Sequence, residues 1–215
     1  ELDRKLQEAK GSLPPIFRWQ PLSHSLTVSP QIVIHRILLQ LTIQRQTIWL
    51  HRKYLAPSYI QKHYEYSRNA CVQAAIKILE FQQIVEEEVH RDGLLYPVRW
   101  MFKASRLQAV FLLGISILCY YVQLAKARPN VSLDQDTGAR IHSLLNNTYS
   151  LWVRLSTVSR EARRAVEHLD VLLGRRQDAN ALDVNPTSTS SASTMPQEAP
   201  VPFDQFTWDA YRGRN

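Results

Sequence analysis

The sequence predicts an all-α protein, with a multi-helix soluble domain around one buried central helix and an irregular C-terminal tail rich in Ser, Thr and Pro. Apolar residues recur at every third or fourth position in several stretches, which is the period of an amphipathic helix. The chain has only six glycines and few runs in which β-branched and polar residues alternate, which argues against a sheet. Hydrophobic residues make up 45% of the 215 positions, which is enough to fill a core.

The first two helices are marked by prolines. Residues 2–10 form a short predicted helix that breaks at Gly11, because the prolines that follow cannot continue it. Ser29 and Pro30 predict the start of the next helix, with a capping hydroxyl followed by proline at the first helical position. This helix is expected to run to about Trp49, and residues 50–57 turn the chain.

A second long helix is predicted over residues 66–89. Ser58 and Gln61 have the spacing of a capping box near its start. Small residues on one face, among them Ala74 and Ala75, predict that a neighbouring helix approaches closely. Gly93 is expected to end this part of the chain by adopting a left-handed conformation.

Residues 107–125 contain no charged side chain, and their apolar residues point in every direction around a helix. Such a helix is buried, either in a protein core or in a bilayer. Its length lies at the lower edge for a membrane span. Periodicity favours a core helix, and a membrane-associated protein with 107–125 as a span stays open as the alternative.

Two further helices are expected before the tail. Asp134 or Asp136 caps the first, over residues 137–155, and Ser156 or Ser159 begins the second, which ends at Gly174. Residues 1–174 are therefore assigned to one helical domain, and 175–202 to a flexible linker, because they are rich in Asn, Ser, Thr, Ala and Pro. In the acidic-aromatic segment 203–215, Phe206 and Trp208 either contact a coactivator or strap the segment onto the domain.

The motifs of common enzyme classes are absent from the sequence, so catalysis is not expected, although a helical enzyme of unknown type stays open. Glu87 and His90 form a single Glu-x-x-His, whereas a helical di-metal site needs two. Residues 86–88 are therefore interpreted as a solvated acidic face. The two cysteines, Cys71 and Cys119, lie in apolar helical surroundings and are expected to be buried thiols. The net charge of +7 comes from scattered basic residues, which indicates a solvated basic surface.

Two short stretches carry a family pattern. The first runs over residues 50–55 and the second over residues 66–79. The matching residues are Leu50, His51, Arg52, Leu55, Tyr66, Ser67, Arg68, Cys71, Ala74 and Ala75. In this order and spacing they resemble the fungal-specific transcription factor domain, the middle homology region of Zn2Cys6 binuclear-cluster regulators. The resemblance covers roughly residues 30–173. Lys53 departs from it, because the family usually has proline there.

The resemblance implies a nuclear regulatory domain, all-helical and without a membrane span. It would modulate DNA binding and activation by conformational control, through a small-molecule effector or a regulatory protein. Zinc and DNA contact are expected only in an upstream six-cysteine module that this chain lacks, and a homodimer only in the full-length protein. The motif residues are expected to be structural, with Arg68 paired to a carboxylate or to helix-end carbonyls, and His51 and Arg52 holding the turn by hydrogen bonds.

If the domain has an effector pocket, it is expected between the central helix and the helix of residues 66–89. The aromatic residues Trp100, Tyr120 and Tyr121 are expected to line it.

Overall fold

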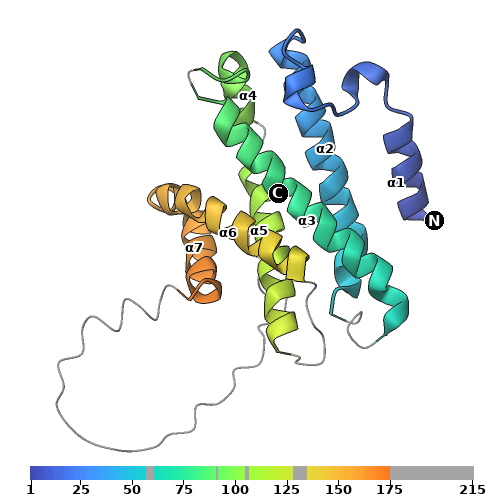
Figure 1. Cartoon of the computed structure of the whole chain (residues 1–215), viewed down its shortest axis with the longest axis vertical. Helices are drawn as coiled ribbons and strands as arrows, with labels where there is room; N and C mark the ends of the chain where they lie inside the picture. Colours follow the sequence, from blue (N-terminus) through green and yellow to red (C-terminus); the bar gives the residue numbers. More distant parts are fainter. Residues whose placement is uncertain (57–60, 91, 105–106, 128–134, 175–215) are drawn as a thin grey trace, which may run out of the picture.

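The computed structural model describes residues 1–56, 61–90, 92–104, 107–127 and 135–174, and within them the fold is all-helical (Figure 1). The α-helices are α1 (Leu2–Gly11), α2 (Pro30–His51), α3 (Glu65–Glu88), α4 (Arg99–Ala104), α5 (Leu107–Lys126), α6 (Gln135–Ser156) and α7 (Arg160–Leu172). Short 3-10 turns at Pro15–Phe17, Leu22–His24, Arg52–Tyr54, Lys62–Tyr64 and Tyr96–Val98 connect them. The predicted fold class is confirmed.

The core is formed by three long helices, with α3 packed against both α2 and α5 (Figure 1). Each contributes a stripe of aliphatic residues that are fully buried, because their three-and-four spacing keeps them on the packed side. These residues include Val33, Ile37, Ile48, Ile78, Leu79, Ile117 and Leu118. The helix α1 lies beside α2 at the outer edge of the molecule, near the N-terminus.

The helices α6 and α7 pack on each other and cover α3 and α5 from the other side. Among the described residues, Trp152 of α6 is the largest side chain that is almost completely buried. The predicted cap at Ser159 is confirmed, since its hydroxyl accepts a hydrogen bond from the Ala162 N–H at 3.2 Å. Gly174 follows α7 with a φ of 73°, a conformation in which glycine avoids the steric cost of a side chain.

The helix α5 is the predicted central helix. Its most apolar stretch has a mean hydropathy of 1.8, so by length and composition it could cross a membrane. In the structure 56% of that stretch is buried inside the molecule, against α3 and α7. Gly114 lies where α5 crosses α3, near the side chain of Ile78 and the carbonyl of Ala75. The predicted close approach of helices at the small residues of α3 is therefore confirmed.

Two predicted helix ends have a different physical cause. The Ser29 hydroxyl accepts no capping hydrogen bond from α2 and instead donates to the side-chain oxygen of Gln31. Gly93 does not adopt a left-handed conformation. It is needed for space, because a Cβ there would lie 2.1 Å from the backbone oxygen of Glu88. Ser58, Asp134 and the segments 175–202 and 203–215, with Phe206 and Trp208, lie outside the described residues.

Candidate functional site

Residues from the two halves of the family pattern meet where α2 ends and α3 begins. His51 is the last residue of α2 and is buried, and its Nδ1 lies 3.1 Å from the hydroxyl of Ser67 in the first turn of α3. This contact ties the two longest core helices together across the connecting turn. This contact is of the kind predicted for His51, and the role of His51 and Arg52 in holding the turn stays a prediction.

The same histidine faces α1 with its other nitrogen. Nε2 of His51 lies 3.3 Å from Oδ1 of Asp3, close enough for an electrostatic contact, although the two atoms are not aligned as a hydrogen bond. The hydroxyl of Tyr66 donates to Oδ2 of Asp3 at 2.6 Å, and the Tyr66 ring lies edge-on to His51. Asp3, His51, Tyr66 and Ser67 are called the α1 clasp below.

Hydrogen bonding shifts the acidity of two clasp residues in opposite directions. The Tyr66 hydrogen bond holds the pKa of Asp3 below its usual value, with a smaller lowering contribution from His51, while desolvation acts in the opposite direction. The hydrogen bond to Asp3 raises the pKa of Tyr66. Both shifts favour a carboxylate that accepts from a neutral phenol. The Asp3–Tyr66 hydrogen bond is therefore compatible with neutral pH.

Ser67, His51 and Asp3 form a row that resembles a hydrolase triad in composition. Acyl-transfer chemistry also needs donors for the oxyanion and a space for substrate beside the nucleophile. In the described part of the chain these three side chains join three helices, and none of them lines the cavity that lies between α1, α2 and α3. The arrangement positions α1 and has the features of a structural contact.

The remaining motif residues make ion-pair, cation–π and packing contacts. Arg68 pairs with Glu65 at 3.2 Å, as expected for a pairing with a carboxylate. The guanidinium of Arg52 lies 4.1 Å from the centre of the Trp49 ring. Leu55, Cys71, Ala74 and Ala75 are buried, and Leu50 is half-buried. Burial raises the pKa of the Cys71 thiol to about 12, so this cysteine is a poor nucleophile at neutral pH.

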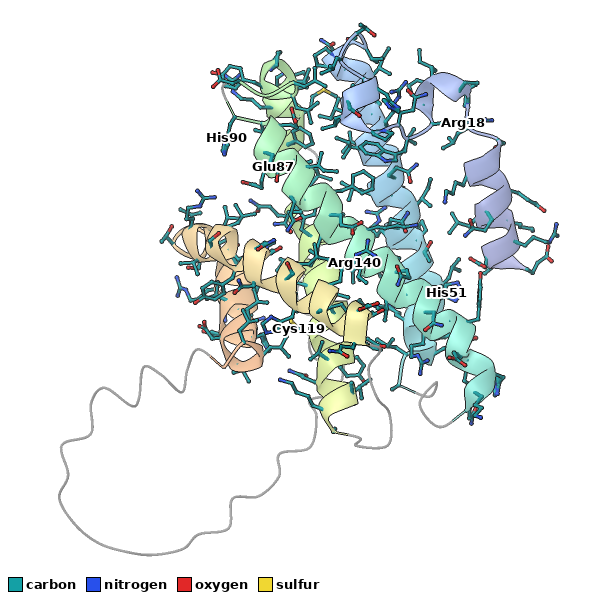
Figure 2. All side chains as sticks on the ribbon, in the orientation of Figure 1. Arg18, His51, Glu87, His90, Cys119 and Arg140 are labelled. Carbon is teal, nitrogen blue, oxygen red and sulfur yellow. The ribbon has the colours of Figure 1, made fainter. Side chains whose placement is uncertain are left out.

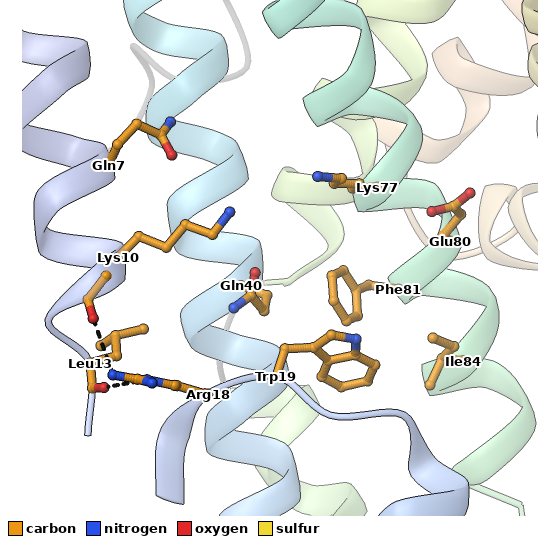
Figure 3. Close-up of a pocket in the computed structure, with 11 residues that line it drawn as sticks. Gln7, Lys10, Leu13, Arg18, Trp19, Gln40, Lys77, Glu80, Phe81 and Ile84 are labelled. Carbon is orange, nitrogen blue, oxygen red and sulfur yellow. Dashed lines mark hydrogen bonds between the residues drawn. The ribbon is translucent and has the colours of Figure 1, made fainter. Parts of the chain in front are cut away.

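The residues predicted to line an effector pocket do not line the cavity that the structure contains between α1, α2 and α3. Trp100 is 64% exposed on α4, and Tyr120 and Tyr121 are half-buried on α5. A cavity of about 670 Å³ instead lies between α1, α2 and α3 (Figure 3). It is lined by Gln7, Lys10, Gly11, Leu13, Arg18, Trp19, Gln40, Lys77, Glu80, Phe81 and Ile84. An effector pocket at Trp100, Tyr120 and Tyr121 stays a prediction.

The acidic end of α3 is only partly the solvated face that was predicted. Glu87 and His90 are exposed near the end of α3 (Figure 2). Glu86 is half-buried, and burial raises its pKa against the influence of Arg154, 3.9 Å away. Glu88 accepts a hydrogen bond from the Leu94 N–H at 2.8 Å and so stabilises the turn after α3. Among the described residues there is no group of three or more His, Cys, Asp or Glu that could hold a metal ion.

These contacts define a helical module whose first helix is fastened at one end and lines a cavity beside the core. The chain is 44% identical over 213 residues to the transcription factor cghF of Chaetomium globosum, covering 99% of this chain and 39% of that protein. It is 43% identical over 182 residues to the pyrrolocin cluster transcription factor fsdR of a fungal species (strain NRRL 50135), covering 81% and 23%. It is 30% identical over 231 residues to the Zn(2)-C6 fungal-type transcription factor pigI of Monascus ruber, covering 96% and 28%.

The chain is thus a relative of fungal transcription factors, some of them of the Zn(2)-C6 type. It spans less than two fifths of the length of each of the three relatives described. No protein-family model matches the chain, and no solved structure matches it significantly.

Proposed function

We propose that this chain is the helical regulatory domain of a fungal Zn2Cys6-type transcription factor, corresponding to the middle homology region of that family. It modulates DNA binding and transcriptional activation by conformational control, through binding of a small molecule or a regulatory protein. The observation that carries this proposal is the 44% identity to a transcription factor over 99% of the chain. The motif residues support it, because they connect three helices through His51.

In this proposal zinc and base contacts belong to a separate DNA-binding module, and the protein acts in the nucleus as a homodimer. One relative is named a pyrrolocin cluster transcription factor, and we propose that this protein also regulates a gene cluster. Residues 175–202 are proposed to link the helical domain to the segment 203–215. Phe206 and Trp208 are its proposed contacts, either with a coactivator or with the domain.

The test compares two substitutions on α3 in the intact protein, expressed in a fungal host. Ile78 is completely buried, so Ile78→Asp places an uncompensated charge in the core and unfolds the domain. Gln73 is exposed on the same helix, so Gln73→Asp adds the same charge without that effect. Transcription of the target genes is measured by a reporter, and binding of the isolated zinc module to its DNA site is measured in vitro.

We expect Ile78→Asp to change reporter transcription, by loss or by constitutive activation, while Gln73→Asp leaves it unchanged. The isolated zinc module should bind DNA without the helical domain. The proposal is wrong if reporter transcription and its response to growth conditions are the same for Ile78→Asp and the unsubstituted protein. Protein levels are compared on a blot, so that degradation is separated from loss of regulation.

A further inference from the structure

We infer that the cavity between α1, α2 and α3 binds a small organic anion with an apolar body, and that such a ligand fastens α1 to the core. This inference rests on the proposed function only where binding is said to change transcription. The cavity has a volume of about 670 Å³, which lies within the range of small-molecule sites, roughly 300–1,000 Å³. The lining combines three cationic side chains with an aromatic and aliphatic wall. It is therefore complementary to an amphipathic anion.

The positive charge in the cavity comes from different elements. Figure 3 shows Lys10 on α1 and Lys77 on α3 directed into the same space. Arg18, from the segment between α1 and α2, is held by its hydrogen bonds to the carbonyls of Leu13 at 2.9 Å and Gly11 at 3.3 Å. A fixed guanidinium loses little conformational entropy when it binds an anion.

The acidic group of the lining is already engaged. Glu80 accepts hydrogen bonds from the guanidinium of Arg140 on α6, one of them from Nε at 3.1 Å. Its negative charge is therefore largely balanced by a residue outside the lining. The three cations of the cavity consequently face a ligand with little competition from protein carboxylates.

The apolar wall is formed by side chains that are already packed. Trp19 and Phe81 contact each other edge to face, with ring centroids 4.8 Å apart, and Ile84 and Leu13 extend the apolar surface. Phe81 is buried on α3, whereas Trp19 is half-buried. This wall provides a surface for an aliphatic or aromatic body, which gains about 25 cal/mol for each Å² that leaves water.

The helix α1 is the movable wall of this site. No residue of α1, all of which the structure describes, is buried. A ten-residue helix is marginal by itself in water, so its place depends on the α1 clasp and on contacts with α2. An anion that contacts both Lys10 and Lys77 adds a second attachment at the opposite end of α1. Binding therefore shifts α1 toward the docked state, which is the conformational control proposed above.

The test uses decanoate and decanol, which share an alkyl chain and differ in charge, below the concentration at which decanoate forms micelles. Affinities for the 215-residue chain are measured by isothermal titration calorimetry. We expect Lys10→Gln and Lys77→Gln each to weaken decanoate binding about threefold to tenfold and to leave decanol binding within a factor of about two. Lys62 is exposed and outside the lining, so Lys62→Gln is the matched control and should change neither affinity.

Hydrogen exchange provides a second measurement. Decanoate should slow exchange of the α1 amides, and decanol should do so less. The inference is overturned if decanoate does not bind, if the two lysine substitutions act like Lys62→Gln, or if α1 exchange is unchanged at saturation. Each of these results leaves the proposed function intact, because the substitutions at Ile78 and Gln73 test that separately. If decanoate binds as expected and the Ile78 substitution has no effect on transcription, the site stands and the regulatory role is wrong.

Discussion

The crossing of α3 and α5 yields the sharpest stability prediction. A Cβ added at Gly114 would lie 2.9 Å from Cγ2 of Ile78 and 3.4 Å from the Ala75 carbonyl oxygen. Carbon atoms pack best at about 3.5–4.0 Å, so the helices must separate by roughly 0.6–1 Å or Ile78 must move. Ile78 is completely buried and β-branched, so it has little freedom to turn away.

Two opposing effects determine how much Gly114→Ala changes the free energy of unfolding. Overpacking of a core typically costs about 1–3 kcal/mol. Replacing glycine by alanine inside a helix returns about 0.5–1 kcal/mol. Gly114→Ala is therefore expected to lower the free energy of unfolding by about 0–2.5 kcal/mol, and Gly114→Val by more. At Gly11 no atom lies within 4 Å of the added Cβ, so Gly11→Ala is the matched control and should be neutral or slightly stabilising.

The assay is urea unfolding of the 215-residue chain, followed by far-ultraviolet circular dichroism. A second substitution isolates the contact, because Ile78→Val keeps the methyl group that Gly114→Ala would meet, while Ile78→Ala removes it. The effect of Gly114→Ala should be the same in the Ile78→Val background. It should be clearly smaller in the Ile78→Ala background, where Cγ2 is gone and Cβ, at 3.3 Å, remains. If Gly114→Ala stabilises the unsubstituted chain as much as Gly11→Ala, the close approach of α3 and α5 is wrong.

Three further predictions concern the turn after α3, the α1 clasp and the thiols. Gly93→Ala should lower the free energy of unfolding by about 1–3 kcal/mol or more, because the added Cβ would lie 2.1 Å from the Glu88 backbone oxygen. Urea unfolding measures this, and an unchanged midpoint would contradict it. Since the folded pKa of Asp3 is lowered below 3.8, its stabilisation of α1 is complete above that value and is lost as the pH falls through the lowered pKa. Slowed exchange of α1 amides should disappear in that acidic range, and Asp3→Asn should abolish the transition. Burial raises the pKa of both Cys71 and Cys119 to about 12, so iodoacetamide at pH 7 should label neither until urea unfolds the chain; labelling of the native protein, detected by mass spectrometry, would refute this.

The helices themselves could be predicted because their signals are local. Pro30 marks the start of α2, and the uncharged stretch 107–125 coincides with α5. The hydrogen bonds at helix ends could not be predicted as well, since they depend on side-chain rotamers. The Ser29 hydroxyl bonds to Gln31 instead of capping the helix. Gly93 follows the end of α3, as predicted, but glycine is needed there because of the close Glu88 backbone, which periodicity does not show.

The site could be predicted only in part, because it depends on contacts between distant segments. The family pattern indicated His51, Tyr66 and Ser67, and the structure brings these together. Their partner Asp3 lies in a short helix that the pattern does not cover. The cavity was missed for the same reason, since Trp19 lies in a proline-bounded loop and meets Phe81 only in the folded chain. The apolar residues of that loop are the sequence feature that could have indicated a contact between the loop and the core.

The two attachments of α1 are linked thermodynamically. The α1 clasp holds the helix through Asp3, and the proposed ligand holds it through Lys10, at the opposite end. If docking of α1 is cooperative, each attachment strengthens the other by the same factor, because coupling between two sites is reciprocal. The motif residues at the clasp therefore influence the cavity without lining it. Under the two proposals above, His51 and Tyr66 set how much of the ligand's binding free energy is available to move α1, and so connect the motif residues to the proposed regulation.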